Sequence, residues 1–435
     1  MDTIEDLTEK AWQAVDPAEL LELTARMADI PSPSGEEAEL AGFLGEFMNE
    51  HGLEGDVQAI QPGQANAVGR YPGAGSGTHL MLYAPIDTAF AGRAEEDSPW
   101  IDLEARPDQV AKATVRDGVV QGLGAHNPKG HGACALMAAV ALARAQIPLS
   151  GHLTVALCAG GMPTNGRPGR PEARRIGHGV GCAHLLEQGG RPDCAVVAKP
   201  GGVSYEEVGV SWFRVRVKGV LGYAGTRHVV KHRNPILDAA KVVEELEAWF
   251  KDYTHANTSG LVAPQGSIGC IRAGWPNKPT FIPEACDILI DLRVSPRTDI
   301  ADVRRQFQGG IEAIAERHPD MVLEWDMLLG VPGSHTDPDH PVIRSTIRGW
   351  EYATGEAYSP QTGGSGATEA NVLRQWGVPT ARVGMTPPPR KLDFSGQFSM
   401  GEAHVESMKA LTRTLIYTAL DLCHPDGTKV QADEG

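Results

Sequence analysis

Four polar side chains that could handle protons or bind anions lie within six positions, just before an apolar helix: His126, Asn127, Lys129 and His131. The glycines around them let the backbone turn tightly or approach a ligand closely. Backbone N–H groups at a helix N-terminus favour anions, and imidazoles titrate near neutral pH. The stretch therefore predicts an anion-binding or acid–base site. A capped helix start with solvated polar residues is the alternative.

Charged residues also follow two predicted buried strands. Asp87 lies at the end of the apolar run 78–90, and Lys199 directly follows the strand 194–198. In α/β proteins, ligands bind beyond the carboxyl ends of the strands. A buried lysine can lose its proton and act as a base or nucleophile. A salt bridge, for example to Asp87, is the alternative for Lys199.

A long loop, 161–179, has no helical or strand periodicity and is rich in arginine. Arg170 and Arg174 lie at its centre, and arginine binds carboxylates in a bidentate manner. We expect the loop to lie on the ligand side of the sheet and to bind an anionic substrate. A solvated surface segment is the alternative.

Composition bounds the class of protein. The chain has 435 residues, which favours two domains, and its 41% hydrophobic and 22% charged residues are ordinary for a globular protein. A net charge of −16 argues against a nucleic-acid partner. The acidic start MDTIEDLTEK does not resemble a signal peptide, and no apolar run is long enough to span a membrane. Seven scattered cysteines predict reduced, buried thiols in a cytoplasmic protein.

The pattern of elements predicts where these residues are placed. Helices alternate with buried strands up to about residue 206, including a helix over 36–50 with Ser34 as its N-cap. The pattern then changes to half-exposed strands and amphipathic helices in the order β-α-β-β-α-β, which indicates a ferredoxin-like insertion. We predict a catalytic domain over 1–206 and 332–435 and an inserted domain over 207–331.

The ordered motifs resemble the aminoacylase, acetylornithine deacetylase and carboxypeptidase G family of di-zinc hydrolases. The resemblance runs nearly end to end and implies a mixed-sheet α/β catalytic domain with an inserted α+β lid that usually dimerises. The matching segments are IPSPSGEE, LMLYAPIDTAF, GLGAHNPKG, DCAVVAKPGG, IPEACDILIDLR and GGSGATEANVLRQWGVPT.

The positions that hold metal in the family carry other residues here. Zinc needs thiolate, imidazole or carboxylate ligands, and proline, glycine and lysine ammonium offer none. We therefore expect no di-zinc centre and no cofactor. The resemblance aligns the ligands with Pro85, Asn127, Gly160-Gly161, Lys199 and about Gln397, and the substrate-contacting histidine of the lid with Tyr223.

The sequence thus favours a metal-independent enzyme on this scaffold, acting on an amide or other C–N bond of a small carboxylate-bearing substrate. Hydrolysis, elimination and amide formation all remain open. We expect a homodimer formed through the lid, with no nucleic-acid or membrane partner. The predicted catalytic residues are Asp87, His126, Lys199, Glu369 (at the family's G-T-S-D aspartate) and Tyr223, and the predicted substrate-binding residues are Asn127, Lys129, His131, Arg170, Arg174 and Gln397.

Two other functions are compatible with the sequence. One is a non-catalytic ligand-binding pseudoenzyme that keeps the pocket and the lid. The other is a metal-dependent hydrolase with relocated ligands, which would have to come from Glu172, His126, His131, His178 or His184.

Overall fold

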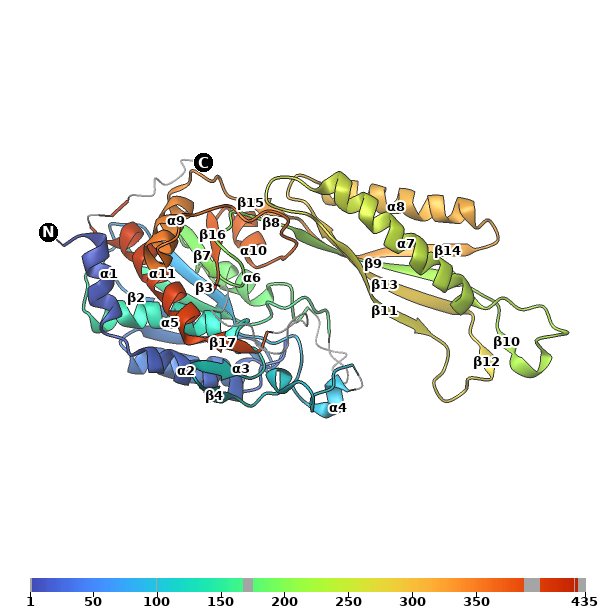
Figure 1. Cartoon of the computed structure of the whole chain (residues 1–435), viewed down its shortest axis with the longest axis horizontal. Helices are drawn as coiled ribbons and strands as arrows, with labels where there is room; N and C mark the ends of the chain where they lie inside the picture. Colours follow the sequence, from blue (N-terminus) through green and yellow to red (C-terminus); the bar gives the residue numbers. More distant parts are fainter. Residues whose placement is uncertain (1, 99, 167–174, 387–399, 426, 429–435) are drawn as a thin grey trace. The chain divides into compact units, whose positions relative to one another are not determined.

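The computed structural model describes residues 2–98, 100–166, 175–386, 400–425 and 427–428. The chain divides into two compact units (Figure 1). The first comprises 1–205, 336–360 and 368–435, and the second comprises 206–335 and 361–367. Each unit has its own hydrophobic core.

The first unit is built on a six-stranded mixed sheet in the order β1-β2-β6-β3-β7-β16. Strands β6, β3, β7 and β16 run parallel, while β1 and β2 are antiparallel. The parallel strands are almost fully buried, as expected of strands covered on both faces. The strands are β1 (Glu54–Gln61), β2 (Gln64–Tyr71), β3 (Leu80–Pro85), β6 (Leu153–Cys158), β7 (Cys194–Ala198) and β16 (Thr380–Val383).

Helices cover both faces of this sheet. Leu82 and Val196 point into the larger core with α5, while their strand neighbours Tyr83 and Val197 point into a smaller core beneath α6 and α10. This alternation follows the period of two of a strand. The larger layer holds α1 (Ile4–Trp12), α2 (Pro17–Asp29), α3 (Ala38–Glu50), α5 (Lys129–Arg144), α9 (Pro341–Thr354) and α11 (Val405–Cys423), and the smaller holds α6 (Val180–Glu187) and α10 (Ala370–Gln375).

A minor sheet lies beside the start of α5. Its order is β17-β5-β4, and the chain between β3 and β4 also forms a short helix and a 3-10 turn. The bounds are α4 (Ala94–Asp97), η1 (Pro107–Gln109), β4 (Thr114–Arg116), β5 (Val119–Gln121) and β17 (Glu402–His404).

One predicted cap is wrong. Helix α3 has Glu37 as its N-cap residue and no side-chain cap hydrogen bond. The hydroxyl of Ser34 instead donates to the carboxylate of Asp87. The N-cap position falls three residues after Ser34, and the Ser34 hydroxyl makes a charge-assisted hydrogen bond to a buried carboxylate instead.

The second unit is a four-stranded antiparallel sheet, β11-β13-β9-β14, with α7 and α8 packed on one face. Strand burial alternates along β13 and β9, as predicted for half-exposed strands. Asn234 and Asp299 cap the two helices.

The main elements of the second unit are β9 (Gly209–Lys218), α7 (Pro235–Asn257), β11 (Gly266–Ala273), β13 (Ala285–Val294), α8 (Ile300–Arg317) and β14 (Val322–Val331). Short pairs are β8 (Glu206–Glu207) with β15 (Ser334–His335) and β10 (Gly222–Tyr223) with β12 (Phe281–Ile282), and η2 spans Ala224–Thr226.

All seven cysteines are free thiols, and six of them are buried, Cys270 being the partly exposed one. Among the described helices, none combines the length and apolar character required to cross a bilayer.

Candidate functional site

Three chain segments meet where the parallel strands β3, β6 and β7 of the first unit end. Strands β3, β6 and β7 run parallel with adjacent registers, so the residues that follow them lie at one edge of the sheet. Pro85 ends β3, Gly161 follows β6, and Lys199 follows β7. These are three of the positions that the family resemblance assigns to metal ligands. The sheet thus brings these three residues to one edge.

The carboxylate of Glu369 enters this edge from the start of α10. Its Oε2 lies 3.5 Å from Nζ of Lys199, and both side chains are almost entirely buried, at 2% and 8% exposed. A Cβ atom on Gly161 would lie 1.9 Å from Oε1 of Glu369 and 2.4 Å from Cβ of Pro85. The carboxylate therefore fills the space that a side chain at position 161 would need.

Asp87 holds the chain segment that follows β6. Its carboxylate is fully buried and accepts hydrogen bonds from the N–H groups of Gly161, at 2.7 Å, and Met162, at 2.9 Å. Ser34 donates the third bond. Burial raises the pKa of Asp87, while these three bonds and the charge of Lys199 act against that rise. The salt bridge of Lys199 is with Glu369 and not with Asp87, whose oxygens already have donors.

A second buried carboxyl group, Glu37, was not selected from the sequence. It accepts from the N–H of Gly35, with both oxygens at 3.0 Å, from the N–H of Gly160 at 2.9 Å, and from Nε2 of Gln64 at 3.3 Å. Burial, and then the charge of Asp87, raises the pKa of Glu37 to about 8. The IPSPSGEE motif could have signalled it, but its partners lie in distant segments.

Lys129 is buried below this edge at 1% exposure. Its Nζ donates to the carbonyl of Ile30 at 2.8 Å. Burial lowers the pKa of Lys129 to about 7, and the charges of Asp29 and Asp87 oppose that shift. The predicted substrate-binding lysine therefore makes its hydrogen bond to the protein's own backbone.

The two histidines of the glycine-rich turn face each other with ring centroids 4.9 Å apart in an edge-to-face arrangement. Nδ1 of His131 bonds the carbonyl of His126 at 2.7 Å, and Nε2 accepts from the N–H of Met385 at 3.2 Å. This pattern fixes a neutral His131, because one nitrogen donates and the other accepts. Burial lowers the pKa of His126 to about 4 and that of His131 well below its ordinary value.

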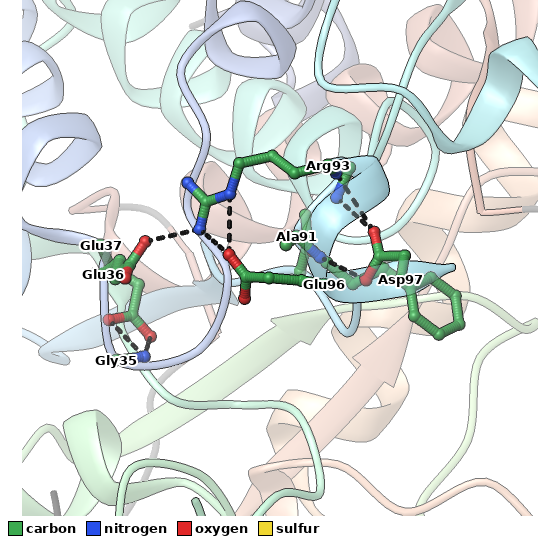
Figure 2. Close-up of polar contacts among 10 residues, drawn as sticks. Gly35, Glu36, Glu37, Ala91, Arg93, Glu96 and Asp97 are labelled. Atoms are coloured by element: carbon green, nitrogen blue, oxygen red, sulfur yellow. Dashed lines mark hydrogen bonds and ion pairs between the residues drawn. The ribbon is translucent and has the colours of Figure 1, made fainter. Parts of the chain in front are cut away.

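The loop that carries Glu37 is tied to the chain after β3 (Figure 2). The guanidinium of Arg93 lies between two carboxylates, donating to Glu36 at 3.2 Å and, through Nε, to Glu96 at 2.8 Å. Asp97 accepts from the N–H groups of Ala91, Gly92 and Arg93, which closes the neighbouring turn. These contacts fix the position of the loop and leave Glu37 pointing inward.

Four further predicted residues are not tested at this edge. Tyr223 lies in the second unit, 48% exposed, where its ring packs against Phe281 at 5.8 Å. Arg170, Arg174 and Gln397 lie outside the described residues.

The residues at this edge do not fit a di-zinc centre. The positions aligned with metal ligands present Pro85, Asn127, Gly161 and the ammonium of Lys199, which repels a cation. Zinc takes nitrogen, sulfur or carboxylate ligands in a tetrahedral set. Over the described part of the chain, no group of three or more His, Cys, Asp or Glu side chains could hold a metal ion.

Buried charge at this edge is instead compensated within the protein. The ammonium of Lys199 faces the carboxylate of Glu369, backbone N–H groups bond the carboxylate of Asp87, and the raised pKa of Glu37 favours its neutral form. Paired charges of this kind avoid the large penalty of burying a lone ion.

Comparisons with known proteins agree with this fold. Residues 205–319 match the M20 peptidase dimerisation domain. The chain is 22% identical over 434 residues to N-formyl-4-amino-5-aminomethyl-2-methylpyrimidine deformylase of Halalkalibacterium halodurans, covering 93% of this chain and 95% of that protein. A local match of 34% identity over 94 residues, 22% of this chain and 21% of its relative, is to N-carbamoyl-L-amino-acid amidohydrolase of Pseudomonas sp. strain NS671.

The fold is also that of a solved structure. The dipeptidase Dug1p of Saccharomyces cerevisiae superposes with a TM-score of 0.71 at 13% identity, covering 96% of this chain and 99% of that one. The chain thus has the mixed α/β fold with an inserted dimerisation domain that these hydrolases share, and along nearly its whole length it resembles the M20 family of aminoacylases and peptidases.

Proposed function

We propose that this chain is a hydrolase-like enzyme that cleaves an amide or related C–N bond in a small carboxylate-bearing molecule without a di-zinc centre. The observation that carries the proposal is the Lys199–Glu369 pair, 3.5 Å apart at the edge of the sheet where metal ligands are expected. The relatives support the reaction class, because one is an amidohydrolase of N-carbamoyl amino acids and another a deformylase.

The pair has the chemistry that amide hydrolysis needs. In the proposed step, Glu369 takes a proton from water as the water oxygen adds to the carbonyl carbon. The ammonium of Lys199 faces the negative charge that develops on the carbonyl oxygen. The C–N bond then breaks, and the proton held by Glu369 passes to the leaving nitrogen. The products are a carboxylic acid and an amine.

Other residues are proposed to support this pair. Asp87 holds the 161–162 segment against it through two backbone bonds. Burial lowers the pKa of His126 to about 4, so its ring is neutral at pH 7, and we propose that it serves the reaction as a neutral hydrogen-bonding group. We propose that Arg170 and Arg174 bind the substrate carboxylate and Gln397 the substrate, and that Tyr223 acts from the lid of a homodimer formed through the matched dimerisation domain.

The test combines metal analysis with turnover. Protein purified without added metal is assayed on N-carbamoyl, N-formyl, N-acetyl and N-succinyl amino acids, with and without a chelator. We expect less than about 0.1 metal ion per chain, activity that survives the chelator, and a loss of at least about 100-fold in kcat for Glu369→Gln. Glu187→Gln, on the exposed surface of α6, is the matched control.

Two results would overturn the proposal. Activity that requires one or two metal ions per chain would identify a metal-dependent hydrolase with relocated ligands. Tight binding of these compounds by the wild type without any turnover would identify a ligand-binding protein.

A further inference from the structure

A cavity of about 340 Å³ opens in the helical layer of the first unit. It forms where α1 and α9 both pack against α11, so residues from the two ends of the chain meet around it (Figure 1). Its volume falls at the lower end of the roughly 300–1,000 Å³ that is typical of small-molecule sites. The side chains that line it include Trp12, Ala353, Glu406, Lys409, Ala410 and Arg413.

The guanidinium of Arg413 reaches this cavity with N–H groups to spare. Its Nη2 donates to the carboxylate of Glu9, and this is the hydrogen bond that the guanidinium makes within the described ranges. Its Cζ lies 5.3 Å from the ring centroid of Tyr352, which holds the side chain in one orientation. A guanidinium carries five N–H donors in a planar fork that suits carboxylates. Nη1 therefore has two N–H groups that a ligand in the cavity can accept.

A second cation, Lys409, lies on the same face of α11, one turn before Arg413. Its Nζ donates to Glu406 at 2.8 Å, and the two side chains are 33% and 64% exposed. This exposure makes the cavity reachable from solvent. An exposed ion pair contributes little stability, so the ammonium can turn toward a ligand. Like charges four residues apart on a helix repel each other, and an anion between them offsets that repulsion.

The rest of the lining limits what this ligand can be. Trp12, Ala353 and Ala410 form an apolar wall. Pro17, the first residue of α2, also lines the cavity but has no N–H, and the next N–H, that of Ala18, already bonds Asp16 at 2.8 Å. The ligand's anionic group is therefore left to the side chains of α11, and its carbon skeleton to the apolar wall.

We propose that this cavity is a binding site for a small carboxylate with an apolar body. The carboxylate lies between Arg413 and Lys409, and the apolar part packs against Trp12. Glu9 and Glu406 already balance the two cations, so a ligand with a single negative charge fits better than a polyanion. The ligand would link α1 to α11. This site is separate from the Lys199–Glu369 edge, and the inference does not depend on the proposed function.

The experiment titrates the full-length wild-type protein by calorimetry in Tris chloride at fixed ionic strength. The probes are benzoate, acetate, inorganic phosphate and benzyl alcohol, which is a neutral analogue of benzoate. We expect one benzoate site per chain with a Kd of about 1 mM or lower. Acetate and phosphate should bind at least about threefold more weakly, since neither has an apolar body, and benzyl alcohol at least about tenfold more weakly.

Three variants test the assignment. Arg413→Met should weaken benzoate at least about tenfold, and Lys409→Met about threefold. Ala410→Leu fills the cavity and leaves both cations in place. It should also weaken benzoate at least about tenfold, with a melting temperature within about 2 °C of the wild type, because leucine suits a helix nearly as well as alanine. It keeps the test decisive if Arg413→Met fails to fold after losing its contact with Glu9.

Arg344→Met is the matched control, because Arg344 lies on α9, pairs with Asp339 and is 58% exposed. It should bind benzoate as the wild type does. Benzoate that binds equally well to Ala410→Leu and the wild type would overturn the inference, since the ligand would then lie elsewhere, for example at the edge of the sheet. Phosphate that binds more tightly than benzoate would replace the carboxylate by a phosphate as the ligand class. The absence of binding by every probe at about 20 mM would also overturn it.

Discussion

A Cβ atom on Gly161 would lie 1.9 Å from Oε1 of Glu369. The glutamate at the start of α10 therefore leaves room only for glycine at position 161. The family resemblance aligns a glutamate pair with 160–161. In the structure, the carboxylate of Glu369 occupies the space that a side chain at 161 would need.

Gly161→Ala should therefore destabilise the first unit. The added methyl group overlaps a buried carboxylate and Pro85, and overpacking of this kind costs about 1–3 kcal/mol. Urea denaturation measures the change. Gly42→Ala in α3, where a Cβ meets nothing within 4 Å, is the control and should raise stability by up to about 1 kcal/mol. Equal effects at the two positions would contradict the proposed packing.

Lys199→Met should lower the free energy of unfolding by about 3 kcal/mol, because it removes the buried cation that faces the carboxylate of Glu369. The double variant Lys199→Met/Glu369→Leu should recover part of that loss, since it removes the carboxylate as well. Chemical denaturation of the three proteins provides the test.

The exposed pair Lys409–Glu406 is the control for this cycle, with side chains 33% and 64% exposed. Lys409→Met should change stability by less than about 1 kcal/mol. A double variant no more stable than Lys199→Met would show that the two side chains do not compensate each other.

Glu37 should make the protein less stable as the pH rises. Its pKa is raised from 4.5 to about 8, so between these values the folded state binds a proton that the unfolded state has released. The free energy of unfolding then falls with rising pH across that window. Glu37→Gln should flatten the fall when unfolding is measured from pH 5 to 8. An unchanged slope in Glu37→Gln, or an equal flattening in Glu36→Gln, would argue against this origin.

Lys129 should act in the opposite direction at higher pH. Its pKa is lowered from 10.5 to about 7, so between these values the unfolded state binds a proton that the folded state lacks. Lys129 therefore makes the free energy of unfolding rise with pH over this window. Denaturation between pH 7 and 10 should show that Lys129→Met removes this contribution to the rise. The surface variant Lys10→Met should keep it.

Part of the layout of elements could be predicted from periodicity. Continuous apolar runs indicated β3, β6 and β7, and alternating patterns indicated β9 and β13 in the second unit. These signals are local, since burial on one or both faces of a strand shows directly in its residues. The resemblance to zinc hydrolases followed from short motifs in a fixed order.

Details that depend on distant partners were missed. Ser34 was expected to cap a helix, yet it bonds Asp87, 53 residues away. Glu37 belongs to the IPSPSGEE motif, but its contacts could not be predicted from that motif, because its backbone partner Gly160 lies 123 residues away. The local sequence of each segment does not predict that the other segment will be its neighbour in the fold.

The sequence by itself determined which side chains occupy the positions that the resemblance aligns with metal ligands, and proline, glycine and lysine ammonium cannot bind zinc in any fold. Only the tertiary structure decided what replaced them. It brought Glu369 into the space beside Gly161 and against Lys199, and it left Oδ1 of Asn127 buried without a donor among the described residues. Burial and pairing depend on parts of the chain that meet only when the sheet and its helices assemble, so those properties belong to the fold.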